Sequence, residues 1–366
     1  MKRVHRMLVA AATALVVVAA PAAAAAGPRE PDRAGLEEIV AAGAVGALAE
    51  IRDAYGVRRS AAGLAELGTR RPVPVDGRFR AGSITKTFLA VVILQLVDEG
   101  RLRLDDTVEQ WLPGAVPEGD RYTVRHLLNH TSGLYDYLRT FRLPPDPELV
   151  DNRWRTWTPA ELLSRATAHP PTSETPGAEF AYSNTNYLLL GLIVEKVTLR
   201  PYGKEIERRV IRRLDLRGTS LPGTRSRIFG PHPHGYVPTG PGDPPPLIDF
   251  TEMNPSVMGA GGSLISTTRD LNRFFRALLG GRLLPDHLLN AMKTPGVEGG
   301  RYGLGLAWRT TTCGSRVYGN DGDALAYQAY SFSTEDRRRQ VTVALTPDFR
   351  GDVDDAVDAF LNQALC

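Results

Sequence analysis

Short segments in which apolar and polar residues alternate form two groups, one near each end of the chain. The first group comprises residues 46–53 and 57–65, joined by a turn at Ala54-Tyr55-Gly56. The second group comprises segments at residues 302–311, 316–318, 324–334 and 340–346. Alternation with β-branched and aromatic residues is typical of strands. The pattern therefore predicts that strands from both groups pair in one antiparallel sheet.

The middle of the chain has the period of helices instead. Residues 88–97 are apolar on every side, which indicates a buried helix that ends near Gly100. Thr158-Pro159-Ala160-Glu161 is a capping box that opens a helix to residue 168. Further helices are expected at residues 123–128, 186–198 and 267–279, and a long loop at residues 219–256.

These elements predict an α/β (α+β) fold with two lobes in residues 27–366. The sheet lobe would contain residues 27–82 and 295–366, with helices at residues 34–42 and 353–365 beside the strands. Residues 83–294 would form a mainly helical second lobe.

Residues 1–26 have the pattern of a secretory signal peptide. Lys2, Arg3 and Arg6 precede an apolar run, and small residues up to Ala26 follow it. The run is short for a membrane span, so we expect cleavage near Ala26, a secreted protein and no stable membrane anchor. Without this segment Lys plus Arg fall from 44 to 41, which equals the 41 Asp plus Glu. A formally neutral chain has no general basic field for nucleic acid or membranes.

The two cysteines of the chain are Cys313 and Cys366. In an oxidising compartment we expect them to form a disulfide, the alternative being two free buried thiols. Closing a loop of that size would stabilise the fold by about 4 kcal/mol in the chain-entropy model.

The sequence indicates no cofactor and no metal ion. His126 and His130 stand four residues apart but lack the glutamate of a zinc helix. His232 and His234 form an isolated pair in a loop, which is a weak metal signal.

Ser83 and Lys86 stand at the start of the buried helix. Residues three apart lie on one helix face, and a helix start leaves free N–H groups beside the serine. A hydroxyl held against an amine is how a serine nucleophile is activated. Such a spacing also occurs by chance, and the alternative is a serine near the helix start with a lysine that reaches towards water.

Tyr182-Ser183-Asn184 precedes the apolar helix at residues 186–198, where its side chains can face a cleft. The ammonium of Lys86 would favour the phenolate of Tyr182, so we expect a lowered pKa and a role as general base. Asn184 would hydrogen-bond an amide of the substrate. On its own, the tripeptide also fits a packed tyrosine followed by an asparagine cap.

Together, these two motifs and a glycine-bearing strand near residue 322 resemble the penicillin-recognising serine hydrolases. The resemblance is closest to the group of class C β-lactamases, D-alanyl-D-alanine carboxypeptidases, esterases and D-amino-acid peptidases. Within it, the chain looks most like the soluble actinomycete DD-carboxypeptidase, which also pairs two cysteines in this region. Matching segments lie at residues 94–100, 126–134, 177–186, 261–267 and 302–306. The resemblance implies the β-lactamase/transpeptidase-like fold.

The resemblance also implies a role for each matched residue. Ser83 would be acylated with the help of Lys86, while Tyr182 would act as general base and acid. Asn184 would orient the acyl amide. The backbone N–H groups of Ser83 and Asp323 would form the oxyanion hole.

The third motif departs from the family pattern. Family members have H-x-G or K-T-G there, whereas this chain has Asn320-Asp321-Gly322-Asp323. Asn320 cannot carry a charge, and two carboxylates flank the glycine. The arginine with which a DD-carboxypeptidase binds a terminal carboxylate would follow Leu306, where this chain has Ala307. Because an acidic edge repels a carboxylate, we expect a neutral or amine-bearing substrate, or weak activity.

The sequence as a whole predicts a secreted serine hydrolase that forms an ester on Ser83 and is D-alanyl-D-alanine carboxypeptidase-like. Its substrate would be a small molecule or peptide, such as a peptidoglycan-like peptide, a β-lactam or an ester. β-Lactamase, esterase and D-aminopeptidase activities stay open, as does a weakly active penicillin-binding protein or pseudoenzyme. We expect a monomer that binds no nucleic acid.

Overall fold

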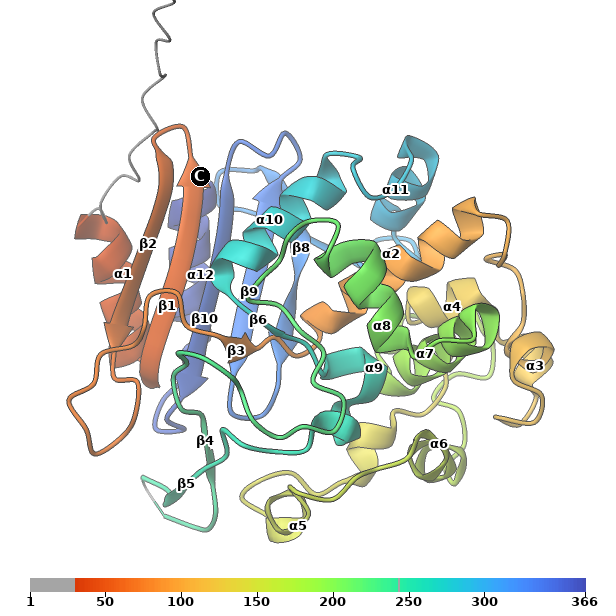
Figure 1. The fold of residues 1–366 in the computed structure, drawn as a ribbon, viewed down its shortest axis with the longest axis horizontal. Coiled ribbons are helices and arrows are strands. Elements are labelled where there is room, and N and C mark those ends of the chain that lie inside the picture. Colours follow the sequence, from red (N-terminus) through yellow and green to blue (C-terminus); the bar gives the residue numbers. More distant parts are fainter. Residues whose placement is uncertain (1–29, 243) are drawn as a thin grey trace, which may run out of the picture.

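Six strands form one antiparallel sheet in the computed structural model of the protein, which describes residues 30–242 and 244–366 (Figure 1). Their order across the sheet is β2-β1-β10-β9-β8-β7. The predicted pairing of the two groups of strands is confirmed, since Gly46 of β1 lies opposite Thr346 of β10. The predicted signal peptide, residues 1–26, lies outside the described residues. The strands are β1 (Ala44–Asp53), β2 (Gly56–Gly63), β7 (Ala307–Thr310), β8 (Arg316–Asp323), β9 (Gln328–Thr334) and β10 (Gln340–Pro347).

Helices cover both faces of this sheet. α1 (Glu30–Ala41) and α12 (Asp354–Leu365) pack on one face, and α10 (Thr268–Leu279) packs on the other. Alternate residues of a strand point to opposite faces, so Val317 enters the core under α12 and Tyr318 enters the core under α10. The α+β architecture expected from the sequence is therefore present.

α2 (Ile84–Asp98) runs through the middle of the helical lobe. Its residues from Ile84 to Leu96 are all buried, as the apolar pattern predicted. Phe88 stacks on Phe274 of α10, which joins this lobe to the sheet. None of the helices in the described part of the chain is long and apolar enough to cross a membrane. The other helices of the lobe are α3 (Val108–Trp111), α4 (Val124–Leu128), α5 (Pro147–Asp151), α6 (Pro159–Thr167), α7 (Asn184–Thr198), α8 (Tyr202–Ile206), α9 (Gly259–Gly262) and α11 (Asp286–Lys293).

Several predicted boundaries were wrong. The strand predicted at residues 302–311 begins only at Ala307, because Gly303 packs on other backbone: a Cβ there would lie 2.2 Å from the Met292 carbonyl oxygen. The strand predicted at residues 324–334 begins at Gln328, since residues 324–327 form the turn after β8. The expected loop at residues 219–256 contains a small sheet of β4 (Tyr236–Pro238) and β5 (Leu247–Asp249), and a second small sheet pairs β3 (Phe79–Arg80) with β6 (Ile265–Ser266).

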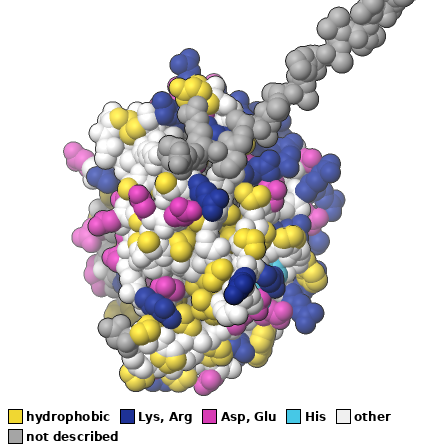
Figure 2. Space-filling view, turned by 90° about the vertical axis from the view of Figure 1, so that its left-hand side faces the viewer, with side chains coloured by type: hydrophobic (Ala, Val, Ile, Leu, Met, Phe, Trp, Pro, Cys, Tyr) yellow, Lys and Arg dark blue, Asp and Glu magenta, His cyan; other side chains and the backbone are white. Residues whose placement is uncertain are grey.

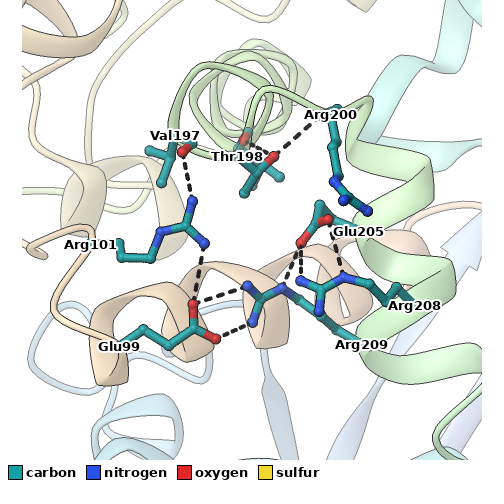
Figure 3. A network of polar contacts seen from close by, with 9 residues as sticks. Glu99, Arg101, Val197, Thr198, Arg200, Glu205, Arg208 and Arg209 are labelled. Carbon is teal, nitrogen blue, oxygen red and sulfur yellow. Dashed lines mark hydrogen bonds and ion pairs between the residues drawn. The ribbon is translucent and has the colours of Figure 1, made fainter.

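The helical stretch from Tyr202 to Ile211 was not predicted, because its charges look like those of an exposed segment. Glu205 and Arg209 are in fact buried and form an ionic network (Figure 3). Arg209 Nε donates to Glu205 Oε2 at 2.7 Å, and its two terminal nitrogens bind the carboxylate of Glu99 at 2.5 and 3.0 Å. Since Glu99 follows α2, the network fixes the end of α2 that lies opposite Ser83.

Arg209→Met is expected to destabilise the protein by about 2–4 kcal/mol, because it removes a cation from the buried carboxylate of Glu205. Chemical denaturation measures the change in the free energy of unfolding. Arg212→Met is the matched control: Arg212 bonds to Glu207 but is mostly exposed, so about 0.5 kcal/mol or less is expected. Equal losses in the two variants would contradict a special contribution of the buried network.

The predicted disulfide between Cys313 and Cys366 is present, with the two Cα atoms 5.9 Å apart. It joins the end of α12 to the turn between β7 and β8. Beside it, the backbone N–H of Thr312 donates to Asn362 Oδ1 at 2.8 Å, so a hydrogen bond holds the same contact.

The face of the molecule that carries α1 and β2 has basic, acidic and apolar side chains interspersed (Figure 2).

Candidate active site

Ser83 immediately precedes α2, and its backbone already has helical angles, with φ −63° and ψ −11°. Its hydroxyl does not cap the helix. Instead, Ser83 Oγ lies 2.6 Å from the hydroxyl of Tyr182 and accepts a hydrogen bond of 3.0 Å from Lys86 Nζ. The structure therefore brings together residues that lie about a hundred positions apart in the sequence, and the serine hydroxyl is free to react.

Lys86 is fully buried below Ser83. Its Nζ donates to Ser83 Oγ, to Asn184 Oδ1 at 2.8 Å and to the Gly261 carbonyl oxygen at 2.8 Å. Burial lowers the pKa of Lys86 to about 7, and two nearby carboxylates oppose that shift. The amide and carbonyl oxygens only accept, so a neutral amine keeps its two N–H groups on them and turns its lone pair to Ser83. Lys86 can then take the serine proton near neutral pH.

Tyr182 has a raised pKa, so the expectation of a lowered one was wrong. Burial raises the pKa of the phenol well above its ordinary value. Lys86 does not reverse this effect, because its Nζ lies 4.9 Å from the centre of the tyrosine ring and its own pKa is lowered. Tyr182 therefore keeps its proton, and the geometry favours Lys86 as the base and Tyr182 as a proton donor.

His130 holds the ring of Tyr182 in place. The two rings stack with their centroids 4.3 Å apart. His130 Nδ1 accepts the backbone N–H of Ser183 at 3.2 Å, and burial lowers the pKa of the imidazole well below its ordinary value. The residue is therefore neutral and supports the site without titrating near neutral pH.

Asn184 has both ends of its side-chain amide occupied. Its Oδ1 accepts from Lys86, while its Nδ2 donates to the two carboxylate oxygens of Asp136 at 3.2 and 3.0 Å. Asp136 also accepts the backbone N–H of Asn184 at the start of α7. Asn184 thus orients Lys86 in this structure. Asp136 is a site residue that the sequence reasoning missed; it lies just after the matched segment at residues 126–134.

The residues of the third motif end β8, next to the start of α2. Asn320 is buried, and its Nδ2 donates to Thr87 Oγ1 at 3.1 Å, so this side chain points towards α2. Asp321 and Asp323 reach solvent, but the protein around them disfavours charge and raises the pKa of both carboxyls. The chain thus has a carboxyl group on each side of Gly322 at the end of β8.

Two glycines let β8 touch the backbone at the start of α2. A Cβ on Gly322 would lie 2.8 Å from the Ser83 nitrogen, and one on Gly82, where φ is +50°, would lie 2.4 Å from the Asp323 carbonyl oxygen. The backbone N–H of Ala324 donates to the Tyr327 carbonyl oxygen, on the side of β9. Because successive backbone N–H groups of a strand point to opposite sides, the N–H of Asp323 points away from β9. The N–H groups of Ser83 and Asp323 therefore lie on adjoining segments, where an oxyanion hole was predicted.

A pocket of about 360 Å³ lies beside Ser83, and we call it the acyl pocket. Ser83, Tyr182, Asn184 and Asp323 supply its polar groups. Both lobes supply its apolar walls, which include Leu138, Leu149, Val237, Val257, Met258, Leu325 and Phe349. No Lys, Arg or His is among the described residues that line it.

No three His, Cys, Asp or Glu side chains in residues 30–242 and 244–366 are grouped as metal ligands would be. His234 Nδ1 lies 2.6 Å from Asp249 Oδ2, and its ring stacks on that of His232. His126 Nδ1 accepts the backbone N–H of Thr123 as part of the helix cap of α4. These histidines thus have local partners.

Acylation of Ser83 is expected to become faster as the pH rises through about 7, the pKa of Lys86. Only the neutral amine can accept the serine proton, so below that pH the rate should fall about tenfold per pH unit. The second-order rate of inactivation by a fluorophosphonate between pH 5 and 9 measures this. A rate that decreases over the same range would show that the ammonium form is the active one.

A Ser–Lys–Tyr centre with a buried lysine, set between an antiparallel sheet and a helical lobe, defines a penicillin-recognising serine hydrolase. The chain belongs to the Beta-lactamase family, whose profile matches residues 33–365. It is accordingly a serine hydrolase of this family.

Three of the known proteins that are similar to the chain illustrate its relationships. A D-stereospecific amidohydrolase from Streptomyces sp., of known structure, is 41% identical, with a TM-score of 0.82 over 91% of this chain and 98% of that chain. Penicillin-binding protein 4* of Bacillus subtilis (strain 168) is 31% identical over 59% of this chain, and D-aminopeptidase of Brucella anthropi is 28% identical over 87% of it. The matches span 48% and 59% of the lengths of these last two proteins, so the chain covers only about half of each.

Proposed function

We propose that this protein is a secreted hydrolase that releases apolar D-amino acids with a free amino group from amides and short peptides. The acyl pocket carries the proposal, because its walls are apolar and, among the described residues that line it, the one charged group is the Asp323 carboxylate. Apolar walls suit an apolar side chain, and a carboxylate suits an ammonium. The printed names of two similar proteins, a D-stereospecific amidohydrolase and a D-aminopeptidase, support the choice of D-residues.

The reaction proceeds in two halves around Ser83. Lys86 takes the proton of Ser83, whose oxygen attacks the scissile carbonyl to form an ester, while the Ser83 and Asp323 N–H groups stabilise the oxyanion. Tyr182, whose hydroxyl is 2.6 Å from the attacking oxygen, donates a proton to the departing amine. The Lys86 ammonium then returns a proton to Tyr182. Water then attacks the ester and gives a proton to the neutral Lys86, which passes it to Ser83 Oγ as the ester bond breaks and the free acid leaves.

DD-carboxypeptidase activity is the competing function. It differs on the acyl side, where a carboxypeptidase holds a blocked peptide chain and an aminopeptidase holds a free ammonium. The carboxylate of Asp323, which lines the acyl pocket, favours the ammonium and therefore supports release of an N-terminal residue.

Hydrolysis of four substrates tests the proposal: D-phenylalanine amide, L-phenylalanine amide, N-acetyl-D-phenylalanine amide and a blocked D-alanyl-D-alanine peptide. We expect D-phenylalanine amide to have a kcat/KM at least about tenfold above the others, since each change removes a charge contact or misplaces the scissile bond. Labelling with a fluorophosphonate, mapped by mass spectrometry, establishes separately that Ser83 is reactive. Faster cleavage of the blocked peptide would overturn the proposal in favour of a carboxypeptidase. Rapid penicillin turnover would indicate a β-lactamase, and absence of any adduct a pseudoenzyme.

A further inference from the structure

A second recess, of about 620 Å³, is lined by β7 and by Asp321 near the end of β8. Its walls include the rings of Phe180, Tyr302 and Trp308. The ring of Tyr302 lies 5.0 Å from that of His130, which stacks on Tyr182. The ring of His130 thus links this wall of the recess to Tyr182, the residue that would protonate a leaving amine.

Asp321 connects this recess to the acyl pocket. It lines the recess, while Asp323, two residues further along β8, lines the acyl pocket. Its charge also acts on both Lys86 and Tyr182. A substrate that places its carbonyl at Ser83 and its acyl part in the acyl pocket would thus extend its leaving group into this recess.

The recess contains two opposite charges that have no ionic partner. Arg309 and Asp358 also line it, but they bind each other at 2.7 Å. Arg301 and Asp321 are exposed and form no ion pair, either with each other or with any other residue that the structure describes. The recess therefore offers one free guanidinium and one free carboxylate at separate points of an aromatic wall.

Arg301 comes from the segment that pairs with the start of β7. The backbone N–H of Trp308 donates to the Arg301 carbonyl oxygen at 2.9 Å, and Tyr302 forms a bridge with Ala307. The guanidinium of Arg301 lies 5.9 Å from the centre of the Trp308 ring. The guanidinium of Arg301 thus lines the recess close to Ala307, the position at which the sequence lacks a cationic residue.

We infer that this recess is the leaving-group subsite and that it selects a residue with both a carboxylate and a side-chain ammonium. Arg301 binds the carboxylate, since a guanidinium and a carboxylate form paired hydrogen bonds. Asp321 and the surrounding aromatic rings attract the ammonium. The inference rests on the proposed function, because it assumes amide cleavage at Ser83. The substrate is then an apolar D-residue joined to a C-terminal diamino acid such as lysine.

Four amides of D-phenylalanine test the two charges separately. Their leaving groups are lysine, norleucine, 1,5-diaminopentane and pentylamine, which have nearly the same carbon chain. Lysine carries both charges, norleucine the carboxylate alone, 1,5-diaminopentane the ammonium alone, and pentylamine neither. We expect each charge to raise kcat/KM by about fivefold to tenfold, as is usual for a partly exposed ion pair. Arg301→Gln should abolish the advantage of the carboxylate, and Asp321→Asn that of the ammonium. Asp323→Asn, on the acyl side, should leave both ratios unchanged.

A binding measurement separates this inference from the proposed function. Calorimetry on the Ser83→Ala variant of the full chain compares free lysine, norleucine and 1,5-diaminopentane without any turnover. Tightest binding of lysine, weakened by either Arg301→Gln or Asp321→Asn, supports the subsite even when no D-phenylalanine amide is hydrolysed. Hydrolysis of the pentylamide without any preference for charge overturns the inference and leaves the proposed function intact. Equal binding of the three compounds also overturns the inference.

Discussion

Ser83→Ala is expected to abolish covalent labelling and to lower amide hydrolysis by about 10⁴-fold or more, because it removes the hydroxyl that forms the ester. The substitution removes the oxygen that lies 2.6 Å from Tyr182 and 3.0 Å from Lys86. Intact-mass analysis after fluorophosphonate treatment measures the adduct, and initial rates measure the turnover. The fold should persist, since the hydroxyl makes no helix cap.

Ser183→Ala is the matched control for that variant. Ser183 is buried and adjoins Tyr182 in the sequence, but its hydroxyl has no hydrogen-bond partner among the described residues. We expect its labelling and turnover to stay within about twofold of the parent. Retention of the adduct in Ser83→Ala would show that another residue is the nucleophile.

Lys86→Met is expected to slow acylation by about 10²–10⁴-fold, the usual contribution of a general base. It should also remove the rise in rate through about pH 7, since that rise reflects the pKa of Lys86. Pre-steady-state labelling at several pH values measures both effects. Lys293→Met is the control, because Lys293 contacts Glu335 and the ring of Tyr318 and none of the described catalytic residues.

The same variant should be more stable than the parent. The folded state lowers the pKa of Lys86 from 10.5 to about 7, so between these values the unfolded state binds more protons. The stability of the parent therefore rises with pH across that window, and replacing Lys86 by methionine should remove the rise and add a few kcal/mol at pH 7. A parent whose stability is flat between pH 7 and 10 would contradict the assigned burial of an amine.

Local patterns were enough to predict the sheet, the buried helix and the disulfide. Apolar and polar residues alternate along a strand because one face of the strand is buried, and α2 has no polar face because it is buried on all sides. The sequence therefore predicts both the strands and the buried helix. Ser83, Lys86, Tyr182 and Asn184 were found through their spacing and resemblance, and the structure places their side chains in contact.

Other features depend on which distant residues meet, and the sequence pattern could not predict them. Asp136 is an ordinary turn residue until α7 presents Asn184 to it. Glu205 resembles a surface charge until Arg209 and Glu99 surround it. Position 307 suggests a missing cation, whereas the structure supplies Arg301 from the adjoining segment.

The pairing of β1 with β10 also has a consequence for how the chain folds. Gly46 pairs with Thr346, which follows it by 300 positions, and the entire helical lobe lies between them. Such a contact has a high entropic cost of loop closure and forms late in folding. Until it forms, the β1–β2 hairpin has one edge without a paired strand. Until β10 arrives, that edge can pair with another chain, which makes the partly folded protein the species most prone to aggregate.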